Sequence, residues 1–254
     1  MLSIEHLTKR FGGNTAVDDI STVFERGCIS AIIGPNGAGK TTFFNLISGT
    51  LAPCRGTIRF EGRDITKLRS DEVARLGIAR TFQSTTLFDT ASVLDNLIVG
   101  HRLRTRSNLW DVLRHSARLR GEERTCREKA REALDFVGLA HLEQRLAGDI
   151  SQEERKRVAI ALALATGPRL VLLDEPAGGI NPEETAALTD LIRRMVANGL
   201  TVCLIEHKMD MVMSLAQHIV VLDHGEKIAE GTPQQVRSDP AVIEAYLGSE
   251  HAAV

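Results

Sequence analysis

Residues 29–41 read ISAIIGPNGAGKT, an apolar run followed by a glycine-rich loop that ends in lysine and threonine. The loop, GPNGAGKT at residues 34–41, fits the pattern GxxxxGK[ST], in which glycines let the backbone curl so that its N–H groups face phosphate oxygens. The apolar run predicts a buried strand, and residues 39–49 predict a helix. The loop therefore has the strand-to-helix context that the pattern requires, and a helix N-terminus also favours an anion.

This loop predicts the binding of a nucleoside triphosphate. Lys40 is long enough to reach the β- and γ-phosphates, and Thr41 offers a hydroxyl to Mg²⁺. The alternative is a glycine-rich turn with a chance lysine, and such a match arises in roughly 1% of chains of this length. We expect the nucleotide to be bound by the loop and the residue after it: Gly34, Pro35, Asn36, Gly37, Ala38, Gly39, Lys40, Thr41 and Thr42.

Composition sets limits on the class of protein. The chain has 254 residues, of which 43% are apolar and 25% charged, and its net charge is −2. These values suit one large domain, or a core domain with a smaller attached one, and they argue against a general affinity for nucleic acid. No apolar run approaches the roughly 18–20 residues that a bilayer span needs. A protein of this kind that acts at a membrane needs a partner that spans it.

Strands and helices alternate along most of the chain, which predicts an α/β fold with a mainly parallel, twisted sheet and helices on its faces. Residues 92–147 differ, because they carry helix formers and many arginines but no proline, and they predict a small helical insert. Its arginines form either a solvated face or a docking surface for an acidic partner. We expect strands at 3–8, 16–24, 28–33, 56–62, 78–82, 170–173, 201–205, 218–223 and 227–231, and helices at 39–49, from 151, and at 183–198, 208–217 and 239–247.

Polar side chains follow three of the predicted strands. In an open parallel sheet, ligands bind outside the carboxyl ends of the strands. Asp174 and Glu175 follow the fully apolar strand LVLL; Asp174 can hold Mg²⁺, and Glu175 can orient or deprotonate an attacking water. The alternative for an acidic pair after a strand is a solvated turn. Behind a phosphate loop, the pair predicts a hydrolytic site.

Three further residues indicate a nucleotide site only when they are considered together. Gln83 can contact both Mg²⁺ and the water, or be an ordinary loop amide. His207, after the strand TVCLI, can donate a hydrogen bond to the γ-phosphate, or be a surface or core histidine. Phe11 can stack its ring on adenine, or be a core aromatic residue.

With the phosphate loop, these residues resemble the ATP-binding subunits of ABC transporters. The matching motifs are GPNGAGKT (34–41), TFQ (81–83), LVLLDEP (170–176) and LIEH (204–207), and the resemblance covers nearly the whole chain. It implies a phosphate-loop NTPase core with a mainly parallel sheet, an N-terminal antiparallel β subdomain and a helical subdomain. The whole chain, 1–254, would be a single ATPase domain, with the helical subdomain inserted at about 85–165.

Longer stretches are similar to the larger ATPase subunit of branched-chain amino acid importers: FGGNTAVDDIS, IARTFQSTTLFDTASVLDNLIVG, DEPAGGINPEE, LIEHKMDMVM and EGTPQQVRSDPAVIEAYLG. The resemblance implies a transport-coupled ATP hydrolase that uses ATP and Mg²⁺. It implies a second ATP-binding subunit, integral membrane permease subunits and, indirectly, a solute-binding protein as partners, with no nucleic acid. The chain would lie peripherally on the cytoplasmic side of the inner membrane. The alternatives are the ATPase of a lipopolysaccharide-type exporter, whose helical insert is shorter, a soluble ABC-type ATPase, and a regulator with weak turnover.

One motif departs from the family. Residues 148–157 read GDISQEERKR at the position of the signature motif LSGGQ, which binds the ATP of the partner subunit. Ser151 matches, but Gln152 and Glu153 stand where glycine is usual. The same residues predict a capping box, in which Ser151 caps a helix and Glu154 reaches back.

The departure favours a heterodimer. A side chain at residue 153 can prevent close approach of the γ-phosphate, and a carboxylate there repels it by a few kcal/mol if the charges come within ~4 Å at an effective dielectric near 20. We expect Ser151 to contact the partner's ATP only weakly, so that a partner with an intact signature motif is needed for one good site.

Overall fold

The computed structural model describes residues 1–81, 87–102 and 117–251. The chain divides into two compact units, Met1–Arg80 with Arg169–Val254, here called the core unit, and Thr81–Pro168, here called the helical unit.

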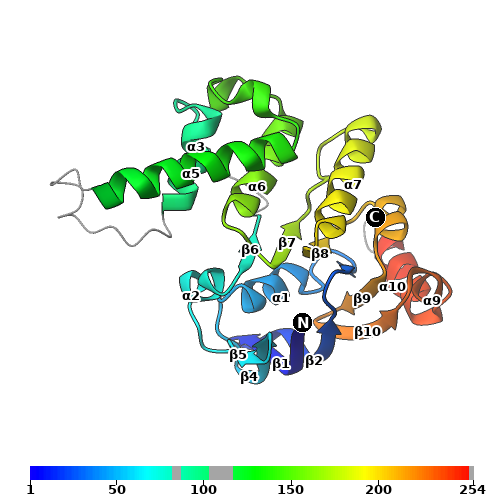
Figure 1. The fold of residues 1–254 in the computed structure, drawn as a ribbon. Coiled ribbons are helices and arrows are strands. Elements are labelled where there is room, and N and C mark those ends of the chain that lie inside the picture. The colour runs from blue at the N-terminus through cyan, green and yellow to red at the C-terminus, as the bar shows by residue number, and fades with distance from the viewer. Residues whose placement is uncertain (82–86, 103–116, 252–254) are drawn as a thin grey trace. The chain divides into compact units, whose positions relative to one another are not determined.

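The core unit contains a six-stranded sheet in the order β10-β9-β3-β8-β7-β6 (Figure 1). All neighbouring strands are parallel except β10, which is antiparallel to β9. Every residue of β3, β7 and β8 is buried, as their continuous apolar runs require. The predicted mainly parallel sheet is confirmed. The strands are β3 (Ile29–Ile33), β6 (Ile78–Arg80), β7 (Leu170–Asp174), β8 (Thr201–Ile205), β9 (His218–Asp223) and β10 (Glu226–Gly231).

A second, four-stranded sheet of the core unit is antiparallel throughout, in the order β2-β1-β4-β5. It confirms the antiparallel β subdomain that the family resemblance implies. Its strands are β1 (Leu2–Phe11), β2 (Asn14–Phe24), β4 (Arg55–Phe60) and β5 (Arg63–Asp64).

Helix α1 (Lys40–Ile47) joins the two sheets into one hydrophobic core (Figure 1). Phe43, Phe44, Leu46 and Ile47 are buried in a cluster that also contains side chains from β1, β2 and β4 and from β3, β7 and β8. Because this buried helix begins at Lys40, it anchors the end of the loop that precedes it. The helix ends before Gly49 because this residue has a φ of 70°, a left-handed conformation that cannot continue a right-handed helix.

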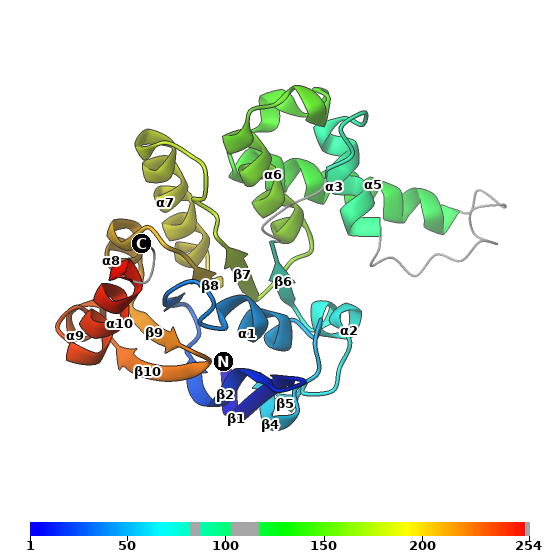
Figure 2. The same ribbon diagram turned by 180° about the vertical axis from the view of Figure 1, so that it is seen from behind.

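The remaining helices of the core unit lie on the flanks of the parallel sheet. Helix α7 packs against α8 and β8, and α9 and α10 lie beside β10 (Figure 2). A capping box between Asn181 and Glu184, with Pro182 in the first turn, starts α7. These helices are α2 (Ser70–Arg75), α7 (Pro182–Ala197), α8 (Met209–Leu215), α9 (Pro233–Arg237) and α10 (Pro240–His251).

The helical unit is built from α3, α5 and α6, which pack against one another. Leu97, Leu134 and Val158 are among its buried side chains, one from each helix. The helical unit therefore buries apolar side chains between its own helices. Its elements are α3 (Val93–Arg102), α5 (Ala117–Phe136), η1 (Ala140–Leu142), η2 (Ala147–Asp149) and α6 (Gln152–Ala165).

Some elements differ from the sequence-based expectation. The strand predicted at 78–82 ends at Arg80, the last residue that pairs with β7, and the helix predicted at 208–217 spans only Met209–Leu215. Elements β5, α2 and α9 were not predicted, because segments of two, six and five residues are too short to show a period. Within the described ranges, no helix has both the length and the apolar character that a bilayer span requires.

Candidate nucleotide site

The phosphate loop connects β3 to α1, and its glycines are required by the backbone. Gly34, Gly37 and Gly39 have φ values of 148°, 83° and 95°. A Cβ on Gly34 would lie 2.0 Å from the Leu222 carbonyl oxygen, and one on Gly39 would lie 2.2 Å from that of Ala16. A Cβ on Gly37 would meet nothing within 4 Å. Gly34 and Gly39 thus allow the loop to pack closely against the backbone of Leu222 and Ala16, and Gly37 faces open space.

That space is a recess of about 460 Å³, a size that suits a nucleotide. Residues 14–16 of β2 form one part of its wall, and Glu175, His207 and His224 form another. The loop contributes every residue from 36 to 42, so most of the predicted phosphate-binding residues lie around one opening.

Lys40 is held by the carbonyl groups of its own loop. Its Nζ donates hydrogen bonds to the oxygens of Gly34 (2.7 Å) and Pro35 (2.8 Å). Burial lowers the pKa of the Lys40 ammonium, and the negative charges of Glu175 and Asp174 offset part of that effect. Phosphate oxygens entering the recess can replace the two carbonyls as acceptors.

Asp174, at the end of β7, is buried and paired with a residue to which the sequence analysis gave no role. Its Oδ2 accepts a hydrogen bond from the Arg80 guanidinium at 2.8 Å. Arg80 also donates to Asn45 Oδ1 (2.6 Å) of α1 and to Oγ of Ser48 (3.2 Å), the residue that caps this helix, and it lies over the Phe44 ring. The predicted metal ligand is therefore fixed to both β6 and α1. The available signal was an arginine at the end of an otherwise apolar strand.

Glu175 and His207, both predicted to be catalytic, are in contact. Nε2 of His207 lies 3.0 Å from Oε1 of Glu175. Glu175 has a φ of 48°, and its N–H donates to the Ile205 carbonyl at 3.0 Å, so the chain leaves β7 beside the end of β8. A carboxylate and an imidazole are thus brought together at the wall of the recess.

The donor set suits a magnesium ion held jointly with phosphate. Among the residues that the structure describes, no three His, Cys, Asp or Glu side chains are grouped to hold a metal. Mg²⁺ usually takes one or two protein ligands and completes its shell with waters and substrate phosphates. Of the two predicted ligands nearest the loop, Thr41 lines the recess, whereas the Asp174 carboxylate is buried against Arg80.

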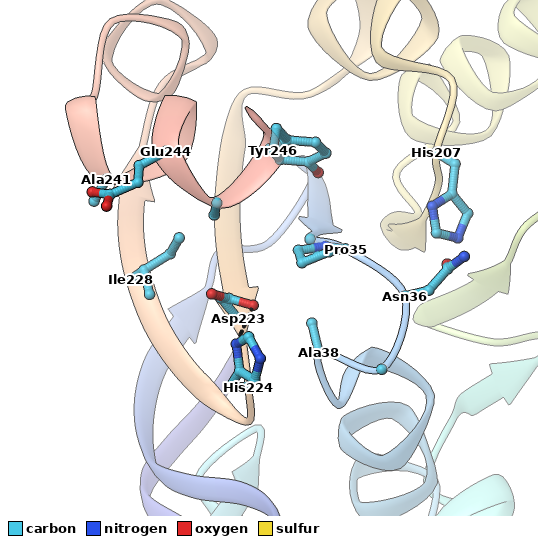
Figure 3. Close-up of a pocket in the computed structure, with 13 residues that line it drawn as sticks. Pro35, Asn36, Ala38, His207, Asp223, His224, Ile228, Ala241, Glu244 and Tyr246 are labelled. Carbon is cyan, nitrogen blue, oxygen red and sulfur yellow. Dashed lines mark ion pairs between the residues drawn. The ribbon is translucent and has the colours of Figure 1, made fainter. Parts of the chain in front are cut away.

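A second hollow, of about 1080 Å³, lies on the side of the loop that faces α10 (Figure 3). The ring of Tyr246 lies over the loop near Pro35, with its hydroxyl directed toward the loop. Burial raises the pKa of the Tyr246 hydroxyl to about 12, although the backbone of Gly34 acts in the opposite direction. Sequence reasoning did not find this contact, because it joins segments about 200 residues apart along the chain.

Phe11 ends β1 and is 46% exposed, so the alternative that it is a core aromatic residue is wrong. It is paired with Asn14, which lines the recess, and Lys9 Nζ lies 5.2 Å from the centroid of its ring. Stacking on adenine stays a prediction. Gln83 lies outside the described residues, and its role also stays a prediction.

In the helical unit, the capping box of α6 is confirmed. Ser151 Oγ accepts from the Glu154 N–H at 3.2 Å, and Glu154 Oε2 accepts from the Ser151 N–H at 2.6 Å. Glu153 forms an ion pair with Arg157, which leaves its side chain only 12% exposed. The Glu153 charge, expected to repel a partner's ATP, is thus largely compensated within its own helix.

The strand–loop–helix with its buried lysine, and the acidic pair at the neighbouring strand end, define a phosphate-loop nucleotide-binding protein. The comparisons refine this class. The family described as ABC transporter matches residues 17–178, and the family described as branched-chain amino acid ATP-binding cassette transporter matches residues 226–252. The chain belongs to the ATP-binding cassette ATPases of ABC transporters.

Similar proteins cover the chain almost completely. It is 41% identical over 249 residues to the high-affinity branched-chain amino acid transport ATP-binding protein BraF of Pseudomonas aeruginosa, with 98% of each chain covered. It is 37% identical over 249 residues to LivG of Escherichia coli, which has the same description, again with 98% of each covered. A crystal structure of the ADP conformation of MJ1267, an ATP-binding cassette of an ABC transporter, matches with a TM-score of 0.86, 36% identity and 98% of each chain covered.

Proposed function

We propose that this chain is the ATP-hydrolysing subunit of an ABC importer for branched-chain or related amino acids. The observation that carries the hydrolytic part is the 3.0 Å contact between Glu175 and His207 at the wall of the recess that holds Lys40. The solute follows from the printed descriptions of BraF and LivG and from the match at residues 226–252.

In this proposal the loop amides and Lys40 hold the β- and γ-phosphates of ATP, and Phe11 stacks on the adenine ring. Thr41, Asp174 and Gln83 hold Mg²⁺, which would neutralise charge on the phosphates. Glu175 accepts a proton from the attacking water. His207 keeps Glu175 in place until ATP binds, and its N–H then donates to the γ-phosphate.

The proposed domain organisation is a single ATPase domain in which the helical unit serves as the inserted subdomain, predicted at about 85–165. Two large apolar side chains of the helical unit support a contact with permease subunits. Phe88 is 63% exposed, Leu146 is also exposed, and Asn96 fixes the backbone of Phe88 through two hydrogen bonds. The chain would lie peripherally on the cytoplasmic side of the membrane, with a solute-binding protein as an indirect partner.

The second ATP-binding subunit in this proposal is a different chain. Ser151 would contact the partner's ATP weakly, because Gln152 and Glu153 add side chains where the family usually has glycine. A partner with an intact signature motif would give the heterodimer one complete site.

The test is magnesium-dependent ATP binding by the full-length chain, measured by equilibrium dialysis, followed by ATP hydrolysis measured in the complex with the second ATP-binding subunit. Lys40→Ala should abolish binding, whereas Lys67→Ala, at an exposed lysine, should leave it unchanged. Glu175→Gln should keep binding and lower turnover by at least about a hundredfold. ATP binding that is unchanged in the Lys40→Ala variant would overturn the assignment of the nucleotide site.

The solute requires a separate experiment. Membrane subunits that co-purify with the chain from its native membrane would be identified and reconstituted in vesicles. ATP-dependent uptake of labelled leucine, isoleucine or valine is expected. Uptake of a sugar or lipid instead would overturn the assignment of the solute while leaving the ATPase intact.

A further inference from the structure

Glu206 is a buried carboxylate with no place in the proposed chemistry. It lies between the end of β8 and His207, and only 2% of its surface is exposed. Buried charges are rare in proteins unless they are fully hydrogen-bonded, because removal from water costs several kcal/mol. A carboxylate at this buried position therefore requires several hydrogen-bond donors.

Its partners are three backbone N–H groups from two separate segments. Oε1 accepts a hydrogen bond from Ala177 at 2.6 Å. Oε2 accepts from His207 at 2.9 Å and from Lys208 at 3.2 Å. An ionised carboxylate accepts all three, since each oxygen has two lone pairs.

The two segments are those that carry the proposed catalytic pair. Ala177 is fully buried two residues after Glu175, and the Gly178 N–H bonds back to the Glu175 carbonyl at 3.1 Å, so this turn sets the direction of Glu175. His207 directly follows Glu206. One carboxylate thus fixes the backbone on both sides of the contact between Glu175 and His207.

Lys208 adds a second connection between the segment 206–208 and the turn that follows β7. Its Nζ donates to the Ile180 carbonyl and to Thr185 Oγ1, both at 2.8 Å. The side chains of Glu206 and Lys208 therefore hold the turn formed by residues 175–181 at two points, Ala177 and Ile180. Glu175 itself has a φ of 48°, a left-handed conformation that costs energy for a residue with a side chain and persists only where its surroundings impose it.

We propose that Glu206 is a positioning residue: it ties the turn 175–181 to the segment 206–208 and thereby sets the alignment of Glu175 and His207. The catalytic consequence of this inference rests on the proposed function. The hydrogen bonds that tie the two segments together do not depend on it. A shift of about 1 Å in a reacting group can lower a rate by about a hundredfold, so the tie matters for turnover rather than for nucleotide affinity.

The test compares Glu206→Gln with Glu25→Gln, an exposed control, in the full-length chain. The amide that replaces the Glu206 carboxylate can accept through its one oxygen only, so one segment loses its partner. Hydrogen–deuterium exchange should accelerate in residues 175–181 and 206–208 and stay unchanged in β1 and β3. In the reconstituted complex with the second ATP-binding subunit, the kcat for ATP should fall about ten- to hundredfold, while the Kd of Mg-ATP stays within about twofold.

A double-mutant cycle separates positioning from a general loss of structure. In a Glu175→Gln background, Glu206→Gln should lower the residual kcat by less than about twofold, because the general base that the tie aligns is already absent. A full additional loss in that background, or exchange that accelerates across the whole core unit, would show a merely structural role and overturn the proposal.

Further outcomes distinguish the two proposals. If Glu206→Gln does not fold, Lys208→Met serves instead: it should accelerate exchange in residues 178–181, and unchanged exchange there would overturn the tie. If the wild-type complex of this chain with its second ATP-binding subunit binds but does not hydrolyse ATP, the proposed function fails and the catalytic part of this inference fails with it. Unchanged exchange in residues 175–181 of the Glu206→Gln variant, with normal ATP hydrolysis, overturns the tie alone.

Discussion

The guanidinium of Arg80 donates a 2.8 Å hydrogen bond to the carboxylate of Asp174, and both side chains are almost fully buried. Removing one partner of a buried ion pair leaves an uncompensated charge away from water, which typically costs about 3–5 kcal/mol. We predict that Arg80→Met lowers the free energy of unfolding by about that amount. Urea denaturation of the full-length chain measures it.

The control is Arg59→Met, which breaks the exposed pair with Glu5 and should cost less than about 1 kcal/mol. The double variant R80M/D174L replaces both charges with apolar side chains and should recover most of the lost stability. A loss in Arg80→Met no larger than in Arg59→Met would contradict the assigned role of the buried pair.

The sequence predicted the features that depend on neighbouring residues. The phosphate loop is encoded in eight consecutive positions, and the strand and helix on either side follow from uninterrupted apolar residues. The capping box at Ser151 and Glu154 is equally local, since its residues are three apart. The acidic pair at the end of β7 was found because a fully apolar strand marks the point at which it leaves the core.

Contacts between distant segments could not be predicted in this way. Arg80 and Asp174 are 94 positions apart, and Ala177 and Glu206 are 29 apart. These contacts can be identified only when the pairing of β6, β7 and β8 is known. Glu206 directly follows the apolar strand TVCLI, but nothing in its neighbours along the chain indicates that it caps a turn from another strand.

Glu230 should make stability depend on pH. Burial raises the pKa of its carboxyl, but hydrogen bonds from Lys227 and Thr22 and the charges of Lys227 and His218 lower it below the ordinary 4.5. Because the pKa in the folded state is the lower one, the carboxylate contributes stability above pH 4.5 and loses that contribution as the pH falls through its folded pKa.

The measurement is the difference in unfolding free energy between wild type and Glu230→Gln from neutral pH downward. The difference should be constant at neutral pH and shrink below about pH 4.5. Glu226→Gln, at an exposed position on the same strand, is the matched control variant. A wild-type advantage that kept its full size down to about pH 3 would contradict the assignment, because a lowered folded pKa requires the advantage to decline with the pH.

Tyr246 should support the phosphate loop from the side of α10 (Figure 3). If its ring keeps the loop in the form that binds phosphate, Tyr246→Ala lowers the fraction of binding-competent chains, and a fall to about a tenth would weaken Mg-ATP binding about tenfold. Tyr246→Phe keeps the ring and should stay within about twofold. Ile243→Ala, at an exposed position of α10, is the control for equilibrium dialysis, and equal affinities of Tyr246→Ala and Ile243→Ala would exclude the supporting role.

Glu153 offers a way to separate charge from shape at the altered signature motif. Its carboxylate is paired with Arg157, so repulsion of a partner's ATP is weaker than an unpaired charge would give. The side chain still prevents close backbone approach, which only glycine permits. In the reconstituted complex, Glu153→Gly should therefore raise ATP hydrolysis more than Glu153→Ala does, even though glycine in α6 costs the isolated chain about 1 kcal/mol. Equal increases in the two variants would identify charge as the barrier, and no increase in either would mean that the substitution does not limit the partner's site.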